Sequence, residues 1–163
     1  MVDAHAALGD QPQPRALVDD SRARLVLEWC DWVDARLARP SEMPEVLVHG
    51  DFHGDNQLWD HSSFRLVAAV DLEEAGIADA EFDFRYLLGN VGTPELALAA
   101  IDAYERRVGR RLDRQRVLAW NVLTHLGDAV WRTEAGVPLP GGGDASTWMD
   151  DLSARMRAFG VNA

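Results

Sequence analysis

The stretch VLVHGDFHGDNQLW, residues 46–59, constrains the fold more than any other part of the sequence. Two histidines and three acidic or amide residues fall within positions 49–56, between two short apolar runs. The apolar runs predict strands, and the Gly, Asp and Asn residues between them predict a tight polar loop. Such a loop is a plain turn, a metal site or a site that handles phosphate.

The rest of the sequence predicts mainly helix around this small β element. Residues 65–73 predict a strand that pairs with residues 56–60 through the polar turn HSSF, which makes a hairpin directly after the loop. Apolar spacing and breakers predict helices over 17–40, 79–90, 93–109, 112–136 and 145–159. Residues 1–15 are expected to be an irregular lead, and residues 16–163 a single domain. The predicted fold class is α+β, mainly α.

The amino-acid composition indicates which ligands the protein can bind and in which cellular compartment we expect it. The 163-residue chain has a formal charge of −11, so nucleic acid is a poor partner and a cationic small molecule is easier to accommodate. No run of apolar residues is long enough to predict a membrane span, and the first residues do not resemble a secretion signal. The single Cys30 excludes an intramolecular disulfide, and we expect a cytoplasmic protein.

The spacing of the polar residues indicates phosphate chemistry. Asp51 and Asn56 stand in the pattern D-x-x-x-x-N, the pattern of the protein-kinase catalytic loop. There the Asp orients the substrate hydroxyl and the Asn supplies an oxygen to Mg²⁺. A hairpin that leaves the loop and returns would carry Asp71 back beside Asn56, and Mg²⁺ prefers such oxygen ligands.

HGDFHGDN followed by VDLEEAGIADAEFDF resembles the aminoglycoside phosphotransferase family, small-molecule kinases of protein-kinase-like fold. The family pattern is H-G-D-x-H-x-x-N, a strand ending in Asp, and G-D-P-x-x-D-L. The residues that match it are His49, Gly50, Asp51, His53, Asn56, Asp71, Asp79 and Asp83. Leu72, Ala78 and Ala80 depart from it at packing and turn positions.

The resemblance implies a role for each matching side chain. Asp51 would be the catalytic aspartate, and Asn56 and Asp71 would be the metal ligands. His49 and His53 would brace the loop. Asp79 and Asp83 would cap a helix and tie it to the loop.

The resemblance covers roughly residues 20–160 and implies the C-terminal, substrate-binding lobe of the fold. The sequence has no G-x-G-x-x-G, and all sixteen basic residues are arginine, so the nucleotide lobe with its phosphate-binding lysine is expected to be absent. ATP would be the phosphate donor, Mg²⁺ the cofactor, and a hydroxyl-bearing small molecule the acceptor. We expect the chain alone to bind ATP weakly and to turn over little. We also expect it to dimerise or to pair with an N-terminal lobe.

Other interpretations of the same residues stay open. A non-catalytic lobe that binds a cationic small molecule or a partner chain is the main alternative. GDFHGD also resembles the opening of calcineurin-like metallophosphoesterases, although the further ligand motifs of that class are missing downstream. Three histidines, His49, His53 and His61, together with Asp51, could bind zinc.

Overall fold

The computed structural model describes residues 20–90, 93–140 and 143–161, so the irregular lead expected over residues 1–15 lies outside the described residues. The chain divides into two compact units. One unit contains the chain up to Pro40 and from Leu118 onward, and the other is the continuous segment Ser41–Val117. Every residue matched to the family motifs belongs to the continuous segment.

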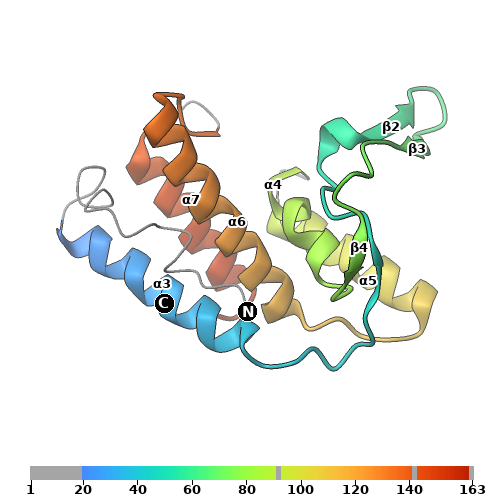
Figure 1. The fold of residues 1–163 in the computed structure, drawn as a ribbon, viewed down its shortest axis with the longest axis horizontal. Helices are drawn as coiled ribbons and strands as arrows, with labels where there is room; N and C mark the ends of the chain where they lie inside the picture. Colours follow the sequence, from blue (N-terminus) through green and yellow to red (C-terminus); the bar gives the residue numbers. More distant parts are fainter. Residues whose placement is uncertain (1–19, 91–92, 141–142, 162–163) are drawn as a thin grey trace. The chain divides into compact units, whose positions relative to one another are not determined.

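The β structure of Ser41–Val117 consists of two short antiparallel pairs (Figure 1). Strand β2 (Gln57–Asp60) pairs with β3 (Arg65–Ala69), which is the predicted hairpin, with an irregularity between Leu58 and Trp59. Strand β1 (Val46–Val48) pairs with β4 (Gly76–Ala78). The sequence did not predict β4, because three small or apolar residues between turns carry no alternating pattern.

The hairpin turn is closed by the carboxylate of Asp60. One oxygen of Asp60 accepts hydrogen bonds from the backbone N–H and the hydroxyl of both Ser62 and Ser63, at 2.7–2.9 Å. These bonds, led by the one from the Ser62 hydroxyl, lower the pKa of Asp60 from 3.8 to about 2. The polar turn HSSF is therefore held by a side chain that the flanking strand supplies.

The helix predicted over 79–90 is wrong in detail. The chain forms a 3₁₀ helix, η2 (Phe82–Tyr86), and only then one turn of α-helix, α4 (Leu87–Asn90). Buried Glu81 accepts hydrogen bonds from the Asp113 backbone N–H (3.1 Å) and the Ser41 hydroxyl (3.2 Å). These contacts anchor the start of η2 at two distant points of the same unit.

Helix α5 (Pro94–Val108) has the predicted ends. The hydroxyl of Thr93 accepts a hydrogen bond from Leu96 N, Pro94 occupies the first turn, and Gly109 ends the helix in the left-handed conformation at φ 72°. Helix α6 (Arg114–Ala135) follows, with Asp113 accepting from Arg116 N at 3.0 Å. Local capping chemistry thus determines both helix boundaries.

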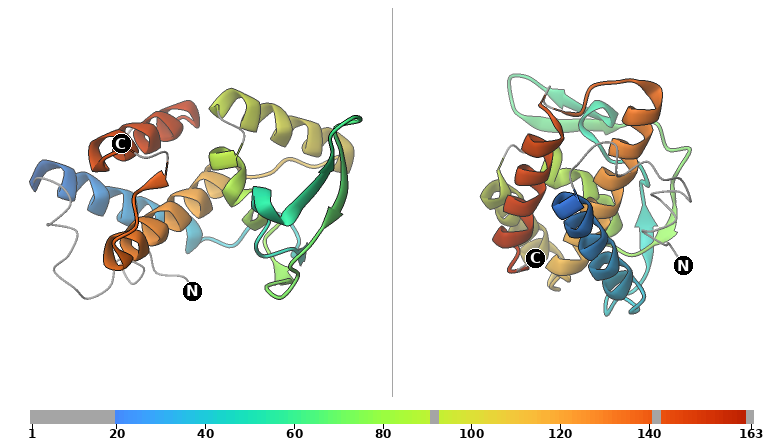
Figure 2. Two further views of the ribbon diagram at one scale, coloured as in Figure 1. Left: turned by 90° about the horizontal axis from the view of Figure 1, so that it is seen from above. Right: turned by 90° about the vertical axis from the view of Figure 1, so that its left-hand side faces the viewer.

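The other unit is helical. Helix α3 (Asp20–Leu37), helix α7 (Ala145–Ala158) and the later part of α6 lie side by side (Figures 1 and 2). Their facing stripes bury a core that includes Trp29, Val33, Val122, Leu126, Leu152 and Met156. None of the helices in the described ranges is both long and apolar enough to span a bilayer.

A histidine in this helical unit should make stability depend on pH. His125 on α6 is partly buried and contacts Arg155 on α7 at 2.8 Å. Burial, and then the positive charge of Arg155, lower the pKa of His125 from 6.5 to about 4. Between these pH values the unfolded chain binds a proton at this position that the folded chain does not. The free energy of unfolding should therefore fall as the pH falls through this window, by about 3 kcal/mol from His125.

Urea denaturation across this pH range checks the expectation. The variant His125→Gln has no titrating ring, so its free energy of unfolding should decline less steeply with falling pH than that of the wild type. Equal slopes for the two proteins would show that His125 does not contribute.

Candidate active site

The loop begins at His49, whose side chain is hydrogen-bonded at both ring nitrogens. Nδ1 accepts from the Asp51 backbone N–H at 3.3 Å, and Nε2 donates to the Val70 carbonyl oxygen at 2.9 Å. Because an N–H can only donate and a carbonyl can only accept, this geometry defines a neutral ring with its proton on Nε2. His49 therefore joins the loop to the end of β3, and it has no ring nitrogen left for zinc.

Asp83 on η2 holds the backbone at the same point. Its Oδ2 accepts from the His49 N–H at 2.7 Å, and its Oδ1 accepts from the Gly50 N–H at 2.9 Å. Both donors lie in buried residues, so their hydrogen-bonding requirement is met by one carboxylate from a segment more than thirty residues away.

Gly50 permits the close approach that this arrangement needs. Its φ is +85°, in the left-handed region, and a Cβ at this position would lie 2.1 Å from the carbonyl oxygen of Glu74. Only glycine satisfies both conditions without strain. The loop backbone therefore packs directly against the segment that follows Asp71.

Two side chains contact the carboxylate of Asp51. Asn56 Nδ2 donates to its Oδ2 at 3.2 Å and also to the Asp51 carbonyl oxygen at 2.9 Å. His53 Nε2 lies 3.3 Å from the same Oδ2, while its Nδ1 accepts from Asp55 N. The charge of Asp51 also contributes to the raised pKa of the nearby Tyr86. Asp51 is thus fixed in direction while remaining about one-third exposed.

The returning hairpin brings Asp71 next to Asn56 along the backbone. The Val70 N–H donates to the Asn56 carbonyl oxygen at 3.0 Å, which extends the ladder by one residue beyond the β2–β3 pairing. Asp71 follows immediately, exposed, with φ at 63°, a left-handed conformation that aspartate adopts more readily than most residues. The backbones that carry Asn56 and Asp71, from two separate stretches of the chain, therefore lie next to each other at the base of the hairpin.

Asp79 does not hydrogen-bond to the loop through its side chain but pairs with an arginine on α6. Its carboxylate accepts from the guanidinium of buried Arg116 on α6, with Nε at 2.6 Å and Nη2 as a second donor. Its carbonyl oxygen accepts from Phe82 N at 3.0 Å, at the start of η2. Asp79 therefore orders the entry to η2 and joins it to α6, whereas the loop itself is held by Asp83.

The sequence did not predict two residues of the site, Arg85 and Tyr86. The buried guanidinium of Arg85 donates to the Gly50 carbonyl oxygen and, at 3.3 Å, to the Tyr86 hydroxyl. It also stacks over the ring of Phe82 at 3.8 Å. Burial raises the pKa of Tyr86, and its interaction with Asp51 acts in the same direction, against the nearby charge of Arg85. Their position two and three residues after the motif aspartate Asp83 was the available signal.

An aromatic pocket of about 810 Å³ lies next to the loop. His49 and Asp83 line it together with the rings of Phe52, Trp59, Phe84 and Tyr104. Phe84 and Tyr104 pack edge to face, with ring centroids 5.0 Å apart. The residues that hold the loop therefore also form part of an apolar cavity wall.

The oxygen atoms of Asn56 and Asp71 are of the kind that bind a hard cation such as Mg²⁺. The amide nitrogen of Asn56 is used by Asp51, which leaves its Oδ1 as an acceptor, and Asp71 offers an exposed carboxylate. Across residues 20–90, 93–140 and 143–161, no three side chains from His, Cys, Asp or Glu gather as a metal site. A Mg²⁺ site made of one amide oxygen, one carboxylate and the oxygens of a bound phosphate would need fewer protein ligands than such a cluster.

Comparison with solved structures identifies the fold. The chain is similar to wild-type aminoglycoside 2'-phosphotransferase-IIIa in its GDP complex, with 22% identity and a TM-score of 0.59, over 96% of this chain and 49% of that one. A point mutant of the same enzyme, also with GDP, matches with 22% identity and a TM-score of 0.58, over 95% and 48%. The fold is therefore that of an aminoglycoside phosphotransferase, which is protein-kinase-like, and the chain spans about half the length of these solved chains.

The family follows from the sequence match. The sequence model that describes the phosphotransferase enzyme family matches residues 3–120, which is more than half of the chain. No curated protein matches. The chain belongs to the phosphotransferase enzyme family.

Proposed function

We propose that this chain is the C-terminal lobe of an ATP-dependent small-molecule O-phosphotransferase, which transfers the γ-phosphate to a substrate hydroxyl. One observation carries the proposal. Asp51 and Asn56 are hydrogen-bonded to each other, and the Asn56 backbone is paired with Val70 next to Asp71. Kinase chemistry requires a base or orienting group and metal-type oxygen ligands, and the hairpin supports their proximity because its backbone pairs Asn56 with the residue before Asp71.

Asp51 is the proposed catalytic residue. Its carboxylate would accept a hydrogen bond from the acceptor hydroxyl and orient that oxygen toward the terminal phosphate. Asn56 and His53 restrict the direction of this carboxylate before substrate binds. Such preorganisation avoids reorganisation during the reaction and is a main source of rate enhancement.

Asn56 Oδ1 and the Asp71 carboxylate would hold Mg²⁺. When bound, the ion neutralises charge on the transferring phosphate. His49 supports both residues, because its ring bonds to the Asp51 backbone N–H and to the Val70 carbonyl oxygen. The loop-bracing roles of His49, His53 and Asp83 are part of the proposal, as is the role of Asp79 in ordering η2.

The donor and acceptor follow from the relatives and the charge. ATP is the proposed donor, and the GDP bound in the similar solved structures makes GTP the second donor to test. The acceptor would be a hydroxylated, cationic small molecule such as an aminoglycoside, since a chain of charge −11 attracts cations. The proposal places the protein in the cytoplasm.

The exposed apolar side chains of the hairpin indicate a surface that binds another protein segment. Leu58, Leu66 and Val67 are between 43% and 69% exposed, which is unusual for neighbouring large apolar residues. We propose that this surface pairs with a nucleotide-binding lobe or with a second copy of the chain.

A transfer assay tests the function. The full-length product of the gene that encodes this chain is incubated with Mg-ATP or Mg-GTP and a panel of hydroxylated antibiotics, and phosphorylated products are detected by mass spectrometry. We expect Mg²⁺-dependent addition of one phosphate to at least one cationic acceptor. Tight binding of an acceptor with no transfer from either nucleotide would instead support the non-catalytic binding module.

A further inference from the structure

The charge of this acidic chain reverses sign over one short segment. Residues 106–116 contain six of the sixteen arginines and one of the 27 acidic residues, a net charge of about +5. The remainder of the chain therefore carries −16. The segment covers the end of α5, the connection after it and the first residues of α6.

Four of these arginines lie free on the surface. Arg106, Arg107, Arg110 and Arg111 are exposed, and none of their side chains has a hydrogen bond or an ion pair with any residue that the structure describes. The other two are paired, Arg114 with Asp102 and Glu105, and Arg116 with Asp79. The segment therefore has more positive charge than its own contacts use.

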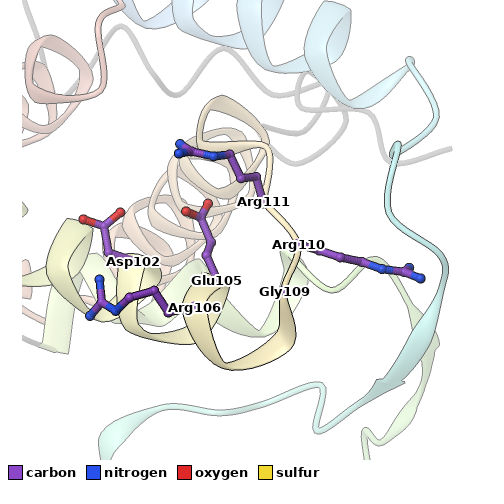
Figure 3. A pocket seen from close by; sticks show the side chains of 6 residues that line it. All are labelled: Asp102, Glu105, Arg106, Gly109, Arg110 and Arg111. Atoms are coloured by element: carbon purple, nitrogen blue, oxygen red, sulfur yellow. The ribbon is translucent and has the colours of Figure 1, made fainter.

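Three of the free arginines line a pocket of about 470 Å³ (Figure 3). Its lining residues are Asp102, Glu105, Arg106, Gly109, Arg110 and Arg111. Figure 3 shows Arg106 and Arg111 on the side of the two carboxylates and Arg110 extended to the other side of Gly109. Gly109 has no atom within 4 Å of the place where a side chain would begin, so the turn leaves the pocket open.

The two carboxylates in this pocket are already engaged. Arg114 contacts Asp102 Oδ1 and, at 3.2 Å, Glu105 Oε2, while Glu105 Oε1 accepts from Leu112 N at 3.0 Å. These hydrogen bonds to Glu105 and Asp102 raise the pKa of Arg114, although burial alone would lower it. Arg114 offsets part of the negative charge, and the three lining arginines remain in excess over what is left.

Helix stabilisation does not account for the whole cluster. Arg106 and Arg107 in the last turn of α5 interact favourably with the helix dipole. Arg110 and Arg111 follow Gly109, beyond the helix, where this benefit is small. Like charges so close together repel each other unless an anion lies between them.

We propose that Arg106 and Arg111, with Arg110 at the rim, bind a compact multivalent anion that carries phosphate or several carboxylate groups. Guanidinium groups match the oxygen pairs of both chemistries. The anion must be compact, because the surrounding chain carries −16 and would repel a long polyanion that extended past the segment. This site shares no residue with the proposed phosphotransfer site and does not depend on it.

Calorimetric titration of the chain with inorganic triphosphate, at low ionic strength and with EDTA to remove divalent metal, tests the proposal. We expect saturable binding that the double variant Arg106→Gln/Arg111→Gln weakens by about tenfold or more. The matched control is Arg65→Gln/Arg157→Gln, which removes the same charge from two exposed positions outside the segment. It should change the affinity by less than about twofold. All four positions are exposed, and circular dichroism verifies folding.

Three results would overturn the proposal. These are an absence of saturable binding, an equal loss of affinity in both double variants, and binding of heparin but not of triphosphate. Asp71→Asn separates this site from the proposed phosphotransfer site, and triphosphate binding should survive it. Because no metal is present, Asp71→Asn only removes a negative charge from the phosphotransfer site, so tighter binding in Asp71→Asn with no loss in Arg106→Gln/Arg111→Gln would place the anion at that site.

Discussion

Replacement of Asp51 by asparagine is expected to lower phosphate transfer by about 10²–10⁴-fold with little loss of stability. The amide has nearly the same shape, so Asn56 and His53 can still donate to its oxygen. It carries no charge and is a very weak proton acceptor, so it cannot assist the acceptor hydroxyl. The effect should fall on kcat rather than on KM, because the missing interaction strengthens in the transition state.

Asp55→Asn is the matched control for this substitution. Asp55 lies in the same loop and has the same charge, but its side chain is 99% exposed and 3.9 Å from His53 Nδ1. Its replacement should leave kcat within about twofold, since an exposed charge in this position is screened. Similar losses in the two variants would mean that loop charge, and not Asp51 itself, supports the reaction.

Gly50→Ala should destabilise the protein by more than about 3 kcal/mol, which is exceptional for the addition of one methyl group. An L-residue at φ +85° is strained, and the new Cβ would also lie 2.1 Å from the Glu74 carbonyl oxygen and 2.7 Å from its carbon. The backbone of Glu74 cannot move without disturbing the segment between Asp71 and β4. Urea denaturation, or the fraction of soluble protein if the variant does not fold, measures the effect.

Gly109→Ala separates the two causes of this expected loss. Gly109 has a similar positive φ of 72°, but no atom lies within 4 Å of an added Cβ. Only the conformational strain applies there, and we expect a cost of about 1 kcal/mol. If Gly109→Ala were as destabilising as Gly50→Ala, the close contact with Glu74 would not be the main cause.

The sequence was sufficient for the parts of the site that depend on local patterns. Two short apolar runs around the HSSF turn predicted the hairpin, and its pairing brings the backbone of Val70, the residue before Asp71, to Asn56. Thr93 and Gly109 marked the ends of α5 because caps act within one helical turn. The mainly helical fold class was confirmed by the structural matches.

The parts that the sequence did not predict depend on long-range contacts. Arg85 reaches Gly50 across thirty-five positions, and Arg116 reaches Asp79 across thirty-seven. Spacing along the chain carries no information about such pairs, and an arginine beside aromatic residues has the pattern of an ordinary surface residue. The 3₁₀ form of η2 was also missed, because its composition alone predicts an α-helix.

The hydrogen bond between Val70 and Asn56 has a practical consequence for labelling this protein. Register at the base of the hairpin is set there and at the Gln57–Ala69 pair, whereas the tip is closed independently by Asp60. The tip can therefore accept a fluorophore at Phe64, whose side chain is 82% exposed, while the pairing between Asn56 and Val70 is kept. A dye attached there would lie outside the residues that line the aromatic pocket.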